Sequence, residues 1–86
     1  MYYLYILKSQ ESGKYYIGET GNIKKRLDAH RKRKSSFGKR NSNLVLVYNK
    51  EFNRRSEAKK LESFLKRQKS RQFLDKLIAG KIIIPP

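Results

Sequence analysis

Two short apolar segments near the start of the chain are separated by a polar turn. Residues 2–7 form an unbroken run of aromatic and aliphatic side chains, which is typical of a buried strand. Residues 14–17 are again aromatic and β-branched, and Gly18 is expected to end this second strand. The polar residues 9–13 end in glycine, so the pattern predicts a β-hairpin.

The chain then takes on helical spacing. Asn22 is an expected N-cap, and Ile23, Leu27 and the region of His30 recur at i, i+4 and i+7 on one helix face. Residues 31–43 have the composition of a basic loop, and residues 44–48 read as a third strand.

Two further helices are expected in the C-terminal half. Ser56 is the predicted N-cap of the first, with Glu57 placed favourably for the helix dipole. Ser70 is the predicted N-cap of the second, and Gly80 fits its C′ position. The expected apolar faces are Ala58, Leu61 and Leu65 in the first helix, and Phe73, Leu74, Leu77 and Ile78 in the second.

The element order β-β-α-β-α-α indicates an α+β fold in which helices cover the apolar faces of a small sheet. The 86 residues fit one domain, which we assign to residues 1–80. Residues 81–86 form a C-terminal apolar tail, for which docking on the fold and exposure are both open. A chain this short buries only about 60% of its surface, so any site must lie close to the surface.

Charge narrows the range of partners. The chain has 22 Lys and Arg residues against 7 Asp and Glu, a formal charge of +15 that is distributed along its length. Nucleic acid is the first candidate partner, because each neutralised phosphate releases counterions. An anionic membrane surface is a weaker alternative, since the cations are not concentrated on one amphipathic helix. A solvated surface that only aids solubility is the third.

Cysteine is absent, which excludes disulfides, zinc-thiolate sites and thiol catalysis. No apolar run reaches the roughly 18 residues that span a bilayer, and the N-terminus lacks a signal-peptide pattern. We therefore expect a cytoplasmic protein that does not enter the membrane.

Residues able to support phosphodiester chemistry occur in three places. Tyr3 and Tyr5 share one face of the first strand, and Tyr16 lies near Gly18, where a missing side chain would let a phosphate approach the backbone. Ordinary strand aromatics are the alternative for any single tyrosine.

Arg26 and His30 lie one turn apart on the first helix and can face one site. Either can bind phosphate, and His30 can also transfer a proton. Glu62 offers the hard oxygen that Mg²⁺ prefers, but the spacing supports an ion pair with Lys66 equally well. Solvated or capping roles are the alternatives for Arg26 and His30.

Taken in order, these segments resemble the GIY-YIG nuclease superfamily. The series is YLY at residues 3–5, YIG at 16–18, an arginine eight residues after Gly18, and EAKKLESFLK at 57–66. The match is nearest to small stand-alone bacterial members and covers residues 2–69 approximately. The resemblance implies a three-stranded antiparallel sheet flanked by helices, in agreement with the element order above.

The resemblance also implies roles for individual residues. Tyr5 would contact phosphate or water, and Tyr16 would activate the attacking water with help from Arg26 or a metal-bound water. Arg26 would stabilise the scissile phosphate, and His30 occupies a position filled by His or Tyr. Glu62 would hold the single divalent metal, Mg²⁺ or Mn²⁺.

Two residues depart from the family pattern. Tyr3 replaces the first-motif glycine and would crowd the site if it pointed inward. Glu19 stands where several members carry a basic residue, so it would repel the substrate phosphate or recruit an additional cation.

The leading hypothesis is a metal-dependent endonuclease acting on structured or damaged DNA, with RNA as an open alternative and a protein partner supplying specificity. The second hypothesis is a non-catalytic DNA- or RNA-binding module on the same fold. Expected nucleic-acid contacts are Gly18, Lys24, Lys25, Arg31, Lys32, Arg33 and Lys66.

Overall fold

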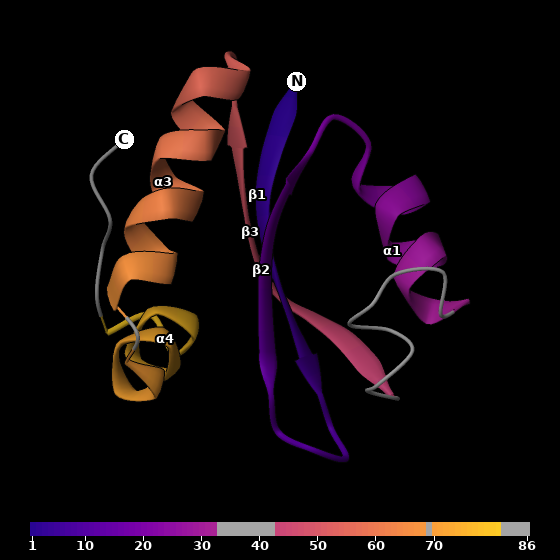
Figure 1. Ribbon diagram of the computed structural model, residues 1–86, viewed down its shortest axis with the longest axis vertical. Helices are drawn as coiled ribbons and strands as arrows, with labels where there is room; N and C mark the ends of the chain where they lie inside the picture. The colour runs from indigo at the N-terminus through magenta and orange to yellow at the C-terminus, as the bar shows by residue number, and fades with distance from the viewer. Residues whose placement is uncertain (33–42, 69, 82–86) are drawn as a thin grey trace.

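The structure, a computed structural model, describes residues 1–32, 43–68 and 70–81. Within these ranges the elements follow the predicted order β-β-α-β-α-α (Figure 1). They are β1 Tyr2–Ser9, β2 Tyr15–Thr20, α1 Ile23–Arg31, β3 Leu44–Phe52, α3 Arg55–Gln68 and α4 Arg71–Ile78. Residues 33–42 of the predicted loop 31–43, and residues 82–86 of the predicted tail 81–86, lie outside the described residues.

The three described strands form one antiparallel sheet in the order β2-β1-β3, so the α+β prediction is confirmed. Figure 1 shows this sheet between two helical layers, with α1 on one face and α3 and α4 on the other. The hairpin register pairs Tyr5 with Gly18 and Leu7 with Tyr16. Because side chains alternate along a strand, this register places Tyr5 and Tyr16 on the same face.

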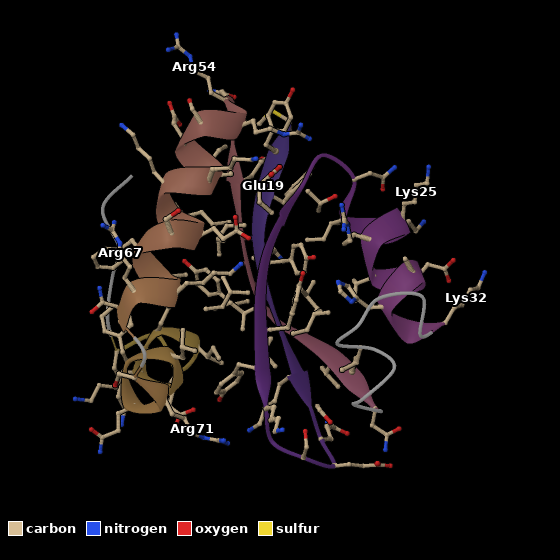
Figure 2. The ribbon with its side chains drawn as sticks, in the orientation of Figure 1. Glu19, Lys25, Lys32, Arg54, Arg67 and Arg71 are labelled. Carbon is tan, nitrogen blue, oxygen red and sulfur yellow. The ribbon has the colours of Figure 1, made fainter. Side chains whose placement is uncertain are left out.

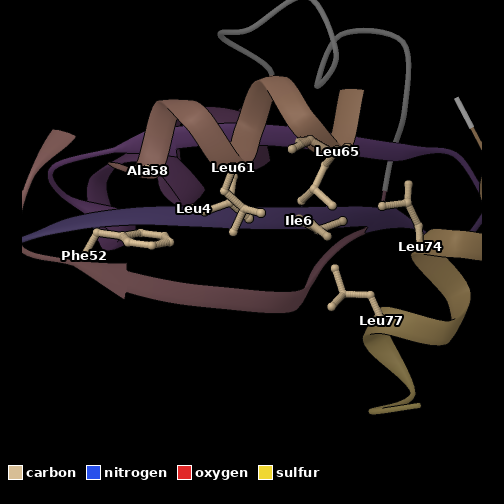
Figure 3. Close-up of a cluster of buried hydrophobic side chains, with 9 residues drawn as sticks. Leu4, Ile6, Phe52, Ala58, Leu61, Leu65, Leu74 and Leu77 are labelled. Atoms are coloured by element: carbon tan, nitrogen blue, oxygen red, sulfur yellow. The ribbon is translucent and has the colours of Figure 1, made fainter. Parts of the chain in front are cut away.

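Side chains on the two faces of β1 contribute to two separate buried clusters. Leu4 and Ile6 are fully buried beneath α3 and α4, whereas Tyr5 and Leu7 are buried on the α1 side. Figure 3 shows the larger cluster, in which Leu4 and Ile6 meet the helical stripe that the sequence predicts. Its other buried members are Ile17, Phe52, Ala58, Leu61, Leu65, Leu74 and Leu77.

Three helix boundaries follow the predicted capping chemistry. The Asn22 side chain accepts from the Lys25 N–H at the start of α1, and the Ser70 side chain accepts from the Phe73 N–H at the start of α4. Gly80 has φ +78° after α4, and its N–H donates to the Leu77 carbonyl at 3.1 Å, as in a Schellman motif.

The other boundaries correct the sequence predictions. Gly18 does not end β2, which continues to Thr20 because its pairing with β1 continues. The polar end of β3 runs on to Phe52 since it too pairs with β1. Ser56 is not an N-cap, because α3 begins at Arg55 and the Arg54 carbonyl accepts from Glu57 and Ala58. No described helix is long and apolar enough to cross a membrane.

Gly18 lies beneath the ring of Tyr5. A Cβ at this position would come within 2.5 Å of the Tyr5 Oη and 3.0 Å of a Tyr16 ring carbon. The space left by the missing side chain is therefore filled by Tyr5, so the structure gives Gly18 a packing role. Its expected contact with a phosphate stays a prediction.

We predict that Gly18→Ala lowers the free energy of unfolding by about 1–3 kcal/mol, because the added methyl must displace the buried Tyr5 ring. Urea unfolding measures this change. Gly21→Ala is the matched control, since its nearest side-chain atoms are carbons of Tyr2 at an ordinary 3.8 Å. Equal stability of the two variants would contradict the packing role.

Candidate active site

Three aromatic side chains from β1, β2 and α1 meet on the α1 side of the sheet. The Tyr5 hydroxyl and His30 Nε2 are hydrogen-bonded at 3.2 Å. The ring of Tyr16 lies 4.8 Å from that of His30 and 6.2 Å from that of Tyr5, measured between centroids. The hairpin register supplies the two tyrosines, and the helical spacing from the Asn22 cap turns His30 toward them.

Burial divides the predicted site residues into two groups. Tyr5 and His30 are each 1% exposed. Tyr16 and Glu62 are partly exposed, and Arg26 is exposed. Burial of Tyr5 does not fit the direct phosphate or water contact implied by the resemblance, and the same holds for direct proton transfer from His30 to a substrate. The reachable groups are Tyr16, Arg26 and Glu62.

Charged residues from both helical layers act on the Tyr5 phenol. Burial raises the pKa of Tyr5, and the neighbouring Tyr16 raises it further. The Arg26 charge lowers this pKa, and the Glu62 charge raises it. Arg26 belongs to α1 and Glu62 to α3, so groups from opposite faces of the sheet lie close enough to influence one phenol. The hydrogen bond and the ring contacts bring Tyr5, Tyr16 and His30 together, and the approach of Arg26 and Glu62 to the same site stays a prediction.

His30 is held in its neutral form. Burial lowers its pKa, and the nearby Arg26 charge lowers it further. A neutral imidazole carries one acceptor nitrogen, so it can accept a hydrogen bond from the Tyr5 hydroxyl.

Glu62 makes the ion pair that its spacing suggested. The Lys66 Nζ lies 3.2 Å from the Glu62 Oε2, and the glutamate side chain is 22% exposed. Within the described residues, no three or more His, Cys, Asp or Glu side chains lie together so that they could hold a metal ion. A lone carboxylate still fits Mg²⁺, which is commonly held by one or two carboxylates together with water and substrate phosphate oxygens. The metal role of Glu62 stays a prediction.

The two off-pattern residues point away from the tyrosine-histidine cluster. The Tyr3 hydroxyl donates to the Glu51 Oε1 at 3.2 Å. Glu51 belongs to β3, which flanks β1 on the edge away from β2. Glu19 accepts from the Arg55 Nε at 3.2 Å, and Figure 2 shows it between β2 and α3. Arg55 has no signature in the sequence, because a pairing across 36 residues leaves no local pattern.

The expected nucleic-acid contacts gather mainly on α1. Lys24 and Lys25 are exposed, and Lys32 forms an ion pair with Asp28 at 3.0 Å. Figure 2 shows Lys25 and Lys32 projecting away from the sheet. Arg31 ends α1, while Arg33 lies outside the described residues. A hollow of about 300 Å³ lies at the start of α1, lined by Thr20, Asn22, Lys25, Arg26 and Ala29.

The lowered pKa of His30 makes the stability of the fold depend on pH. The folded protein resists protonation of this ring, whereas the unfolded chain binds the proton near pH 6.5. The stabilisation is therefore complete above about pH 6.5 and is lost as the pH falls toward the lower folded-state pKa. We expect thermal unfolding of the wild type to shift downward across this window more than that of His30→Gln. Parallel curves for the two proteins would contradict a buried neutral histidine.

Comparison with known proteins identifies the family of this chain. A family model described as the GIY-YIG catalytic domain matches residues 1–75. The solution NMR structure of a UPF0213 protein from Bacillus halodurans is similar, with a TM-score of 0.59 and 28% sequence identity. That match covers 94% of this chain and 86% of the other. No curated protein matched. Since the family model covers most of the chain, this protein belongs to the GIY-YIG family.

Proposed function

We propose that this protein is a metal-dependent endonuclease that hydrolyses phosphodiester bonds in DNA. Family membership implies nuclease-type phosphodiester hydrolysis. One observation supports the assignment to these residues above all. The Tyr5 hydroxyl is hydrogen-bonded to His30 Nε2 at 3.2 Å, the ring of Tyr16 lies 4.8 Å from that of His30, and Arg26 lies one turn before His30 on the same helix.

Tyr16 is the proposed acceptor of the proton from the attacking water. The water oxygen forms a bond to phosphorus, the bond from phosphorus to the leaving oxygen breaks, and the water proton passes to the phenol oxygen. An unassisted phenol has a pKa near 10 and is a poor base at neutral pH. The proposal therefore requires a route by which Tyr16 can give up its own proton.

The buried pair behind Tyr16 supplies that route. The Tyr5 hydroxyl is hydrogen-bonded to His30 Nε2 at 3.2 Å, and the ring of Tyr5 lies 6.2 Å from that of Tyr16, measured between centroids. As Tyr16 takes up the water proton, its own proton moves to Tyr5, and the Tyr5 proton moves to His30 Nε2. Tyr5 and His30 are thus positioning and relay residues, and neither touches the substrate.

Arg26 and Glu62 supply the electrostatics. The exposed guanidinium of Arg26 can bind the phosphate and offset the charge that develops in the transition state. Glu62 would hold one Mg²⁺ or Mn²⁺, which supplies Lewis-acid stabilisation of the leaving oxygen when bound. Lys66, now paired with Glu62, is then available for a neighbouring phosphate.

Binding of the DNA backbone is assigned to the exposed lysines of α1. Lys25 and Arg26 line one hollow, and Lys24 and Lys25 line a second. Phosphate contacts of this kind position a nucleic acid without reading its sequence. Specificity would then come from the shape of the substrate or from a protein partner.

A cleavage assay with supercoiled plasmid and branched DNA in Mg²⁺ tests the proposal. We expect the wild type to nick these substrates, and Glu62→Gln and Arg26→Gln each to lower kcat/KM by about 10²-fold or more. Glu57→Gln is the matched control, because it removes an exposed acid from the same helix.

Cleavage at the wild-type rate by either site variant would falsify the residue assignment. Tight, salt-sensitive DNA binding without cleavage under any divalent metal would instead favour the non-catalytic binding module.

The two tyrosines should differ in how their loss affects the kinetics. Tyr16→Phe removes the proton acceptor and should lower kcat by about 10²–10⁴-fold. Tyr5→Phe interrupts the relay, so it should lower kcat while leaving KM for DNA unchanged, because the buried hydroxyl is out of reach of the substrate. Single-turnover kinetics over a range of DNA concentrations separates the two effects. A raised KM in Tyr5→Phe would show that its hydroxyl contacts DNA.

A further inference from the structure

An ion pair at the end of β2 connects the two segments that deliver Arg26 and Glu62. The Arg55 Nε lies 3.2 Å from the Glu19 Oε2. The Glu19 side chain is only 7% exposed, whereas that of Arg55 is 57% exposed. The guanidinium also lies over the ring of Tyr2, 5.1 Å from the ring centroid, so Arg55 is held on two sides.

Glu19 lies shortly before the helix that carries Arg26, and Arg55 begins the helix that carries Glu62. Glu19 is followed by Thr20, whose Oγ1 accepts from the Asn22 N–H at 3.1 Å, and Asn22 caps α1. Arg55 is the first residue of α3, and Glu62 follows it seven residues later, about 10.5 Å along the helix. The pair therefore joins the entrance of α1 to the start of α3.

The two helices lie on opposite faces of the sheet, as Figure 1 shows, so they do not pack against each other. Their spacing is set through β2, which precedes α1 directly and lies beside α3. Catalysis by groups from separate elements is sensitive to such spacing, since a displacement of 1 Å can cost on the order of 10²-fold in rate.

We propose that the Glu19–Arg55 ion pair is a positioning pair, which sets the distance between the helix that carries Arg26 and the helix that carries Glu62. This role rests on the proposed function of those two residues. The role also accounts for Glu19, which departs from the family pattern. Its carboxylate is directed to Arg55 at the start of α3.

Loss of Arg55 and loss of Glu19 should have unequal effects on the spacing of the helices. Arg55→Gln removes the cation that pairs with a carboxylate of little access to water, so the end of β2 must move to solvate it. Glu19→Gln leaves only an arginine that is already largely exposed. The arginine substitution should therefore disturb the spacing of the helices more than the glutamate substitution does.

The distance between the helices is directly measurable, because the chain has no native cysteine. Spin labels on Asp28→Cys in α1 and Ser63→Cys in α3 use exposed positions outside the proposed machinery. Dipolar spectroscopy should give one narrow distance distribution for the otherwise native protein, a broadened or displaced one for Arg55→Gln, and a smaller change for Glu19→Gln. Lys59→Gln, an exposed cation on the same helix, is the control and should change nothing.

Cleavage kinetics provides the second readout. Arg55→Gln should lower kcat by about 10–100-fold and raise the Mg²⁺ concentration that gives half-maximal rate, because Glu62 is no longer held opposite Arg26. Arg55→Lys should recover part of the rate, since it keeps the charge but not the fork geometry. The exchanged pair Glu19→Arg with Arg55→Glu should recover more than either single change.

The results separate this inference from the proposed function. Altered distances in Arg55→Gln with no cleavage by any protein, wild type included, would support the positioning pair and overturn the nuclease assignment. An unchanged distance distribution in Arg55→Gln would overturn the positioning role, whatever its rate.

Discussion

The pairing register of β1 against β2 is the constraint on which the site depends. It sets Tyr5 opposite Gly18, and the glycine leaves the space in which the Tyr5 ring lies. A slip of one residue would turn every side chain of the strand to the other face. Tyr5 would then lie under α3 in place of Leu4 and Ile6, which are completely buried there. The apolar core therefore enforces the register that builds the site.

The strand order explains why two tyrosines that lie near each other in the fold differ in their exposure to solvent. Tyr5 is on the central strand and is enclosed by its neighbours, so its hydroxyl can serve only the groups around it. Tyr16 is on the edge strand and stays partly exposed. The two phenols thus differ in exposure because of their positions in the sheet, and not because of residue type.

Local patterns predicted much of this fold. Asn22, Ser70 and Gly80 satisfy helix ends through side chains or backbone only a few residues away, so their roles are readable from sequence. The stripe of Ala58, Leu61 and Leu65 is equally local. The strand ends were not readable from local sequence, because the extensions to Thr20 and Phe52 depend on pairing with β1.

The candidate site shows the same division. The family pattern singled out Tyr5, Tyr16 and His30, which the fold brings into contact, but it did not reveal that Tyr5 and His30 are buried. It also left Glu19 as an anomaly, since its partner Arg55 is 36 residues away. Exposure and long-range ion pairing follow from packing, which a single sequence does not display.

The most direct test is a structure of the wild-type protein with bound Mn²⁺ and DNA. The DNA carries a phosphorothioate at the scissile position, which slows cleavage. The account predicts one ion on the Glu62 carboxylate, with Tyr16 and Arg26 facing the same phosphate and Tyr5 still hydrogen-bonded to His30 behind them. An ion bound away from Glu62, or a scissile phosphate beyond the reach of Tyr16 and Arg26, would contradict it.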